Sequence, residues 1–226
     1  EDMDRAFDDA IAITAGAMNA VVLDLPGADL AGVDYGVDFM KKANLGEPLT
    51  VGKNVVVIGG GYTAMDCSRT SLRHGADNVA ILYRRTRSEL VVDEEELGET
   101  EREGVRMEFL VSPLELIGEN GRITGVKMIK NRLGEPDASG RRSPIPIDGS
   151  EYIVPADTVI PAVSQSADLG FLPVESSFEV ARGRVKVDPA TYATNVRGVW
   201  ACGDFVTGPT TMIESAGHAK KCAYAI

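Results

Sequence analysis

The chain has 226 residues, of which 44% are hydrophobic and 25% are charged, and its formal net charge is −11. This composition is ordinary for a globular protein, and the negative charge argues against nucleic acid or an anionic membrane as the main partner. No apolar run approaches the roughly 18–20 residues that a membrane-spanning helix needs.

The chain opens without a methionine on the acidic residues Glu1–Asp4, which are not typical of a signal peptide. We therefore expect an N-terminally truncated piece of a longer protein. The first predicted element is a short buried strand within residues 7–17. A linker rich in glycine follows at 24–36, and a short amphipathic helix from Val37 ends near Gly46.

Residues 54–83 have the pattern of a βαβ unit. Val55–Ile58 is a continuous β-branched run, which is typical of a fully buried parallel strand. A helix is predicted over Thr63–His74 with Gly75 as its C-cap, and Val79–Tyr83 is the next strand. The length agrees with the roughly 30 residues of such a unit.

The remaining elements extend this alternation. A glutamate-rich, solvated helix is predicted over 88–104 and a strand over Val105–Val111. Residues 114–130 form a predicted hairpin because Asn120-Gly121 lies between two alternating runs. The later elements are a polar hairpin loop at 131–150, a strand at Thr158–Ala162, an irregular stretch at 164–183, strands at Arg184–Val187 and Gly198–Cys202, and a helix over Thr210–Ile226. The whole pattern predicts an α/β fold, with a parallel sheet flanked by helices and an inserted β-hairpin layer.

The glycine-rich turn Gly59-Gly60-Gly61-Tyr62-Thr63-Ala64 lies between a predicted strand and a predicted helix. Gly59 would allow the tight turn, Gly61 the approach of a pyrophosphate, and Ala64 the close packing of helix on strand. The helix N-terminus would offer free N–H groups to the phosphates. We therefore expect this turn to bind a dinucleotide; the alternative is a plain glycine-rich turn.

A basic segment, Arg84-Arg85-Thr86-Arg87, follows the second strand of this unit. NAD-binding versions place an acid here for the ribose 2′-OH, but this chain has none until Glu89. A guanidinium can pair with a 2′-phosphate through a planar fork. We therefore predict that Arg84 and Arg85 select NADP(H); the alternative is a solvated charge run paired with Asp93–Glu96.

Gly203-Asp204 ends a predicted strand, and Thr210-Thr211 opens the last predicted helix. A strand that ends in Gly-Asp and leads into a helix N-terminus fits a second phosphate or ribityl site. Gly-Asp is also a common turn, which is the alternative.

The three cysteines, Cys67, Cys202 and Cys222, are far apart in the sequence. They form no CxxC pair and no cluster with histidine, so we predict no active disulfide, iron–sulfur cluster or zinc site in this chain. A reducing cytoplasm is the simplest setting.

These motifs together resemble the glutamate synthase small (beta) subunit family, which includes the related flavoprotein parts of dihydropyrimidine dehydrogenase and of the NADH-dependent ferredoxin–NADP oxidoreductase large subunit. The resemblance covers almost the whole chain. It rests on the glycine turn, Tyr83-Arg84-Arg85, Leu133–Asp137 followed by Gly140-Arg141-Arg142, and Gly203-Asp204.

The resemblance implies an NADPH-binding domain at residues 36–165 inserted in a partial FAD-binding domain made of 1–35 and 166–226. It implies that Ser164, where the family commonly has glycine, contacts cofactor. The cofactor-binding residues implied for the FAD segment are Gly203, Asp204, Thr210, Thr211 and Met212.

The activity that follows is a flavoprotein oxidoreductase module. A hydride would pass from NADPH to FAD, and electrons would leave through iron–sulfur clusters or a partner subunit of the full-length protein. The protein's part is to position the nicotinamide over the flavin and exclude water, so no side chain is predicted to be catalytic. One alternative is an isolated, non-catalytic NADP(H)-binding fragment, because the FAD domain's own glycine fingerprint is absent. The other is a disulfide-type pyridine-nucleotide reductase, which would need two neighbouring cysteines.

Overall fold

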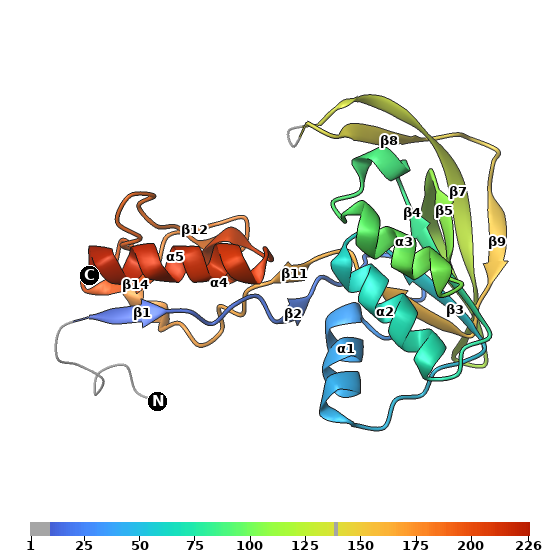
Figure 1. Ribbon diagram of the computed structural model, residues 1–226, viewed down its shortest axis with the longest axis horizontal. Coiled ribbons are helices and arrows are strands. Elements are labelled where there is room, and N and C mark those ends of the chain that lie inside the picture. The colour runs from blue at the N-terminus through green and yellow to red at the C-terminus, as the bar shows by residue number, and fades with distance from the viewer. Residues whose placement is uncertain (1–9, 138–139) are drawn as a thin grey trace. The chain divides into compact units, whose positions relative to one another are not determined.

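A computed structural model describes residues 10–137 and 140–226, and the chain divides into two compact units. The inner unit is Val22–Val163, and the outer unit joins the chain up to Val21 to Ser164–Ile226 (Figure 1). The chain therefore enters and leaves the inner unit once, as it does in an inserted domain. The assignment of the two units to NADPH and FAD remains a prediction.

A parallel sheet forms the centre of the inner unit. Its four strands have the order β10-β3-β4-β5 and comprise Thr158–Pro161, Asn54–Ile58, Asn78–Tyr83 and Arg106–Phe109, respectively. Val55 and Val57 of β3 belong to one buried cluster, and Val56 and Ile58 belong to another. Since successive side chains of a strand point to opposite faces, both faces of β3 are covered, which explains the unbroken β-branched run.

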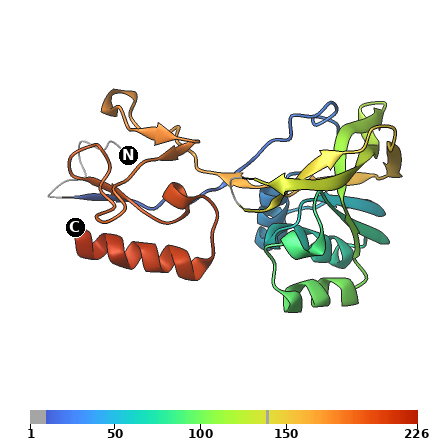
Figure 2. The ribbon, with the colours of Figure 1, turned by 90° about the horizontal axis from the view of Figure 1, so that it is seen from above.

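Helices cover one face of this sheet (Figure 2). Phe39, Met65 and Leu97, from three different helices, are buried with Val55 and Val57 in the same cluster. The expected helices near 37–46 and 63–74 are confirmed. The helical elements of the inner unit are α1 (Gly36–Leu45), α2 (Tyr62–Arg73), the short 3-10 helix η2 (Arg87–Glu89) and α3 (Glu94–Arg102).

The expectation of one solvated helix over 88–104 is wrong. Asp93 interrupts the segment as the N-cap of α3, where its side chain accepts a hydrogen bond from the Glu96 N–H. Glu89, in η2, is buried. The segment is therefore divided into η2, which contains the buried Glu89, and α3, which begins after its N-cap Asp93.

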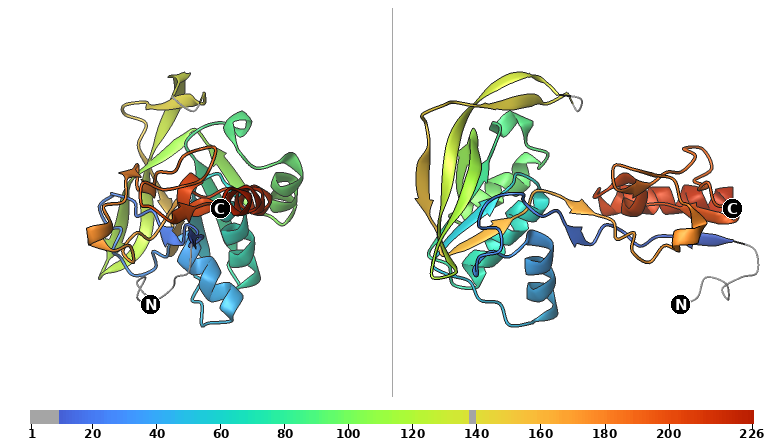
Figure 3. Two further views of the ribbon diagram at one scale, coloured as in Figure 1. Left: turned by 90° about the vertical axis from the view of Figure 1, so that its left-hand side faces the viewer. Right: turned by 180° about the vertical axis from the view of Figure 1, so that it is seen from behind.

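An antiparallel hairpin layer covers the other face of the sheet (Figure 3). The predicted Asn-Gly turn is confirmed, with φ values of 51° at Asn120 and 76° at Gly121. The expected loop at 131–150 is narrower than predicted, because the strand before it continues to Pro136 and pairs with a further strand. The layer consists of β6 (Val111–Glu119), β7 (Arg122–Pro136), β8 (Arg142–Pro146) and β9 (Tyr152–Pro155).

The predicted linker at 24–36 belongs to the inner unit. Leu30 and Val33 pack against the cluster below the hairpin layer, and Val33 also bridges to Val159 of β10. The inner unit therefore begins at Val22, earlier than the predicted boundary at 36, whereas its end at Val163 lies close to the predicted 165.

The outer unit contains short paired strands around a small core. Ile13, Val199 and Phe205 are buried together. Strands were predicted within 7–17 and at 184–187 and 198–202, and the structure has one in each, although residues 1–9 lie outside the described part. Its elements are β1 (Ile11–Ile13) paired with β14 (Val199–Ala201), β2 (Asn19–Ala20) with β11 (Gln165–Ser166), β12 (Val180–Ala181) with β13 (Arg184–Val185), and the helices η3 (Val174–Ser176), α4 (Asp204–Thr207) and α5 (Met212–Ala225).

Among the described residues of both units, none of the helices has the length and apolar character needed to cross a membrane.

Candidate functional site

The glycine turn lies at the carboxyl end of β3, between that strand and α2. A Cβ on Gly59 would lie 2.3 Å from the carbonyl oxygen of Ala162, and one on Gly60 would lie 2.4 Å from the ring of Tyr83. Neither position has room for a side chain. Packing within the protein therefore requires glycine at both Gly59 and Gly60.

Gly61 has different surroundings. A Cβ there would meet no heavy atom within 4 Å, so the space beside this residue is open. Gly61 is the N-cap of α2, no side chain caps the helix, and its first turn carries no acidic residue. Within the described chain, the N–H groups of Gly61, Tyr62 and Thr63 donate to no backbone carbonyl. Free N–H groups at the positive end of a helix form a site that fits a pyrophosphate.

The side chains of this turn contact neighbouring elements of the inner unit. Ala64 is fully buried between helix and sheet, as its predicted role requires. The Tyr62 hydroxyl donates to Asp93, the N-cap of α3, over 3.0 Å, and this bond raises the pKa of Tyr62. Thr63 is half-buried beside Gly36 at the start of α1. The backbone amides of Tyr62 and Thr63 are therefore available to a ligand.

The predicted phosphate ligand Arg85 is buried and has partners inside the fold. Its side chain is only 3% exposed. Its Nε donates to the carbonyl of Arg142 over 2.7 Å, and its terminal nitrogen donates to the Asp137 carboxylate over 2.6 Å. A buried guanidinium needs a countercharge, and the tip of the β7–β8 hairpin supplies it. The structure therefore gives Arg85 an internal partner.

Arg84, in contrast, is exposed. Its carbonyl accepts a hydrogen bond from the side-chain amide of Asn131 over 3.2 Å. Partial desolvation lowers the pKa of Arg84, and the neighbouring guanidinium groups of Arg85 and Arg141 lower it further. A concentration of positive charge at the end of β4 is the setting in which a phosphate dianion binds.

Arg87 follows the alternative reading of the basic segment. It forms ion pairs with Glu94 at 3.0 Å and Glu101 at 2.7 Å, both in α3. The charge-run hypothesis therefore describes Arg87, although Glu101 lies outside the predicted Asp93–Glu96 range.

The acidic and basic partners around this site were not predicted from the sequence. Arg142 pairs with Glu89 at 2.7 Å, and Glu89 also accepts hydrogen bonds from the backbone and hydroxyl of Thr86. The Thr86 hydroxyl and Arg142 lower the pKa of Glu89. Asp137 and Arg142 lie in the family-specific run that the sequence singled out without a role. Their partners are more than 50 positions away, and no local pattern reveals such pairs.

The outer unit brings the residues of the second motif together. Gly203 has a φ of 66°, which favours glycine. One carboxylate oxygen of Asp204, Oδ1, accepts from the Thr210 N–H at 3.1 Å, the Thr210 hydroxyl at 2.7 Å and the Ser215 hydroxyl at 2.8 Å. Thr211 is the N-cap of α5 and forms a capping box with Glu214.

Two further predicted residues have less defined surroundings. Met212, the first residue of α5, is almost fully exposed. Ser164 belongs to the outer unit rather than the inner one, and its carbonyl accepts from the Val21 N–H over 3.3 Å. Its φ of 157° is rare for a residue with a side chain.

Two cysteines that are far apart in the sequence are neighbours in the fold. Cys202, after β14, and Cys222, in α5, are buried in one cluster with Tyr192. Burial, with the Cys222 thiol, raises the pKa of Cys202 to about 11. A buried thiol with a raised pKa is a poor nucleophile. Both thiols are buried, so this pair lacks the exposed thiol of a disulfide reductase.

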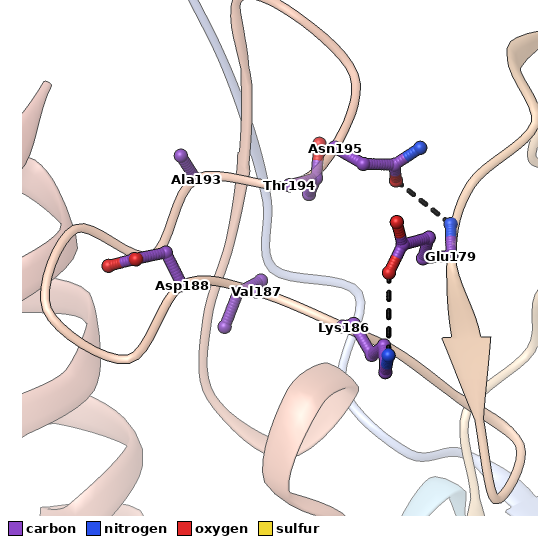
Figure 4. Close-up of a pocket in the computed structure, with 7 residues that line it drawn as sticks. All are labelled: Glu179, Lys186, Val187, Asp188, Ala193, Thr194 and Asn195. Carbon is purple, nitrogen blue, oxygen red and sulfur yellow. Dashed lines mark hydrogen bonds and ion pairs between the residues drawn. The ribbon is translucent and has the colours of Figure 1, made fainter.

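A cleft of about 360 Å³ lies elsewhere in the outer unit (Figure 4). The backbone N–H of Glu179 donates to Asn195 over 2.8 Å, and the Glu179 carboxylate pairs with Lys186 at 3.4 Å. The polar groups of this cleft therefore form hydrogen bonds and an ion pair with one another. None of the predicted site residues lines the cleft.

Comparison with known proteins gives a consistent result. The family model described as "Pyridine nucleotide-disulphide oxidoreductase" matches residues 4–222. The chain is 43% identical over 222 residues to the "NADP(+)-dependent formate dehydrogenase subunit beta" of Moorella thermoacetica, covering 96% of this chain and 31% of that protein. It is 35% identical over 231 residues to the "Glutamate synthase [NADPH] small chain" of Azospirillum brasilense, covering 96% and 48%. The chain thus spans less than half the length of both relatives.

Solved structures support the fold. The structure of FprA from Mycobacterium tuberculosis in complex with NADPH aligns with a TM-score of 0.76 at 21% identity, covering 95% of this chain and 61% of that one. At this identity the similarity concerns the fold alone, and the predicted α/β class is confirmed.

Proposed function

The chain belongs to the pyridine nucleotide-disulphide oxidoreductase family, as the resemblance drawn from its motifs indicated, and on this premise we propose that it is an NADPH-dependent flavin oxidoreductase module. The inner unit binds NADP(H), and the outer unit forms part of an FAD site. The names of the two relatives support this proposal, since both specify NADP and both denote one subunit or chain of an enzyme.

The open helix N-terminus at Gly61 is the observation that carries the proposal. The N–H groups of Tyr62 and Thr63 hold the pyrophosphate, and Gly61 leaves space for it. Arg84 holds the 2′-phosphate, because it is the exposed arginine at the end of β4. Arg85 supports it from within the fold.

The second cofactor is proposed to lie at the N-terminus of α5. The Oδ1 atom of Asp204 takes three hydrogen bonds, whereas Oδ2 accepts none from the described residues and is available to a ribityl hydroxyl. The other proposed contacts near this carboxylate in the sequence are Gly203, Thr210, Thr211 and Met212. Ser164 is a further proposed contact.

The cofactors supply the hydride chemistry: NADPH donates it and FAD accepts it. The residues of this chain bind and orient the two nucleotides, and no acid, base or nucleophile is proposed. In the whole protein, electrons would pass to an iron–sulfur domain or a partner subunit. We place the protein in the cytoplasm, because its three cysteines are free thiols.

Gly61→Ala tests the nucleotide site. The added methyl meets no protein atom, and φ −108° and ψ 178° suit alanine, so the variant should fold like the wild type. We expect it to lose NADPH affinity by about tenfold or more, because the methyl occupies the phosphate space. Titration calorimetry with NADPH measures this loss.

Gly98→Ala, within α3, is the matched control, because it makes the same change on a helix of the same unit and should leave binding unchanged. Wild-type affinity in Gly61→Ala would contradict the proposed site. Flavin absorbance after incubation with FAD separates an oxidoreductase module from a non-catalytic NADP(H)-binding fragment.

A further inference from the structure

We propose that Asp137 is a positioning residue that sets the preference for NADP(H) over NAD(H), acting through its ion pair with Arg85. The inference rests on the proposed function, because it concerns the same nucleotide site. It gives the β7–β8 hairpin a role in nucleotide selection, in addition to the roles of the glycine turn and the basic segment.

The ion pair fixes the direction of Arg85. The guanidinium is almost fully buried, and its contacts with Asp137 and with the carbonyl of Arg142 come from the two sides of the hairpin tip. A buried guanidinium held by two fixed acceptors has one favoured position. The hairpin therefore holds Arg85 inside the fold.

The same layer fixes the backbone around Arg84. The carbonyl of Arg84 accepts from Asn131 of β7, and the carbonyl of Arg85 accepts from the Leu110 N–H over 3.0 Å. With both carbonyls bound and the Arg85 side chain directed inward, Arg84 is the exposed arginine of this adjacent pair. Its direction thus depends on the hairpin.

The charge distribution supports the same role. Arg85 pairs with Asp137, Arg142 pairs with Glu89, and Arg84 has no ion-pair partner among the described residues. If Asp137 were not paired with Arg85, its carboxylate would be available to Arg84 and would repel a phosphate dianion. The Arg85–Asp137 pair therefore keeps a positive group free at the position of the 2′-phosphate.

A 2′-phosphate and a 2′-hydroxyl respond differently to this arrangement. Only NADP(H) carries the dianion, so disturbing Arg84 should weaken NADPH and spare NADH. A purely structural role of the pair would weaken both nucleotides equally. The ratio of the two dissociation constants therefore distinguishes positioning from simple destabilisation.

The test measures NADPH and NADH binding to the 226-residue chain and to Asp137→Asn. We expect the NADPH dissociation constant to rise by about tenfold while that of NADH changes less than about twofold. Asp137→Glu should restore most of the preference. Asp77→Asn is the matched control, because it removes an exposed Asp–Lys pair at the amino end of β4 and should change neither constant.

Asp137→Asn leaves a buried guanidinium without its countercharge and could unfold, so the double variant Arg85→Met/Asp137→Leu is measured as well. It should lose the preference too. An unchanged or increased preference for NADPH over NADH in either folded variant would overturn the inference and leave the proposed function standing. In Asp137→Asn, such a result would mean that the freed Arg85 binds the phosphate itself. A wild-type chain with no preference for NADPH would overturn both.

Discussion

The carbonyl oxygen of Ala162 lies where a side chain on Gly59 would begin: a Cβ there would be 2.3 Å from it. This contact joins the turn after β3 to the residue that follows β10. Two glycines of one motif, Gly59 and Gly61, therefore serve different purposes, since one is required by packing and the other leaves space for a ligand.

Gly59→Ala should destabilise the protein, whereas Gly61→Ala should not. At Gly59 the methyl meets backbone, and the φ of 149° is unfavourable for alanine. We expect a loss of about 2 kcal/mol or more in the free energy of unfolding. Urea denaturation of the two variants measures the difference, and equal stability would show that the turn tolerates a side chain at both positions.

Glu103→Gln should lower stability at neutral pH and reduce its dependence on acid. Hydrogen bonds from Arg69 and then Arg73 lower the pKa of Glu103 to about 2. The unfolded value is about 4.3, so the stabilisation is complete above that pH and is lost as the pH falls toward 2. The wild type and the variant should therefore converge near pH 2 in urea denaturation.

Glu99→Gln provides the comparison for this prediction, because Glu99 forms an exposed i,i+3 pair with Arg102. Such a pair contributes little, so this variant should follow the wild type at every pH. A Glu103→Gln variant as stable as the wild type at pH 7 would contradict the role of the Arg69–Glu103 pair.

The three thiols should be unreactive in the native protein. Cys67, Cys202 and Cys222 are all buried, and burial raises the pKa of Cys67 as well as that of Cys202. Because the thiolate is the reactive form, a chromogenic thiol reagent at pH 8 should titrate the cysteines only after unfolding. Rapid native labelling of Cys202 or Cys222 would revive the disulfide-reductase alternative.

Local patterns in the sequence determined the elements that form the nucleotide turn. The β-branched run Val55–Ile58, the glycines from Gly59 to Gly61 and the Asn120-Gly121 turn all depend on interactions within a few residues. Over such short distances, backbone preferences and side-chain periodicity can be recognised in the sequence itself. The strand, the turn, the helix and the hairpin were therefore predicted correctly.

Tertiary structure alone decided which of two adjacent arginines faces outward. Arg84 and Arg85 have the same chemistry and neighbouring positions, and the sequence gives no reason to treat them differently. Arg85 is buried and Arg84 is exposed because Asp137, 52 positions away from Arg85 in the sequence, forms an ion pair with Arg85 in the fold. The contact of Cys202 with Cys222 has the same origin. Burial and ion pairing depend on which distant segments come together in the fold. Local sequence therefore determined the glycine turn proposed to bind the pyrophosphate. The packing of the hairpin decided which arginine is exposed at the end of β4.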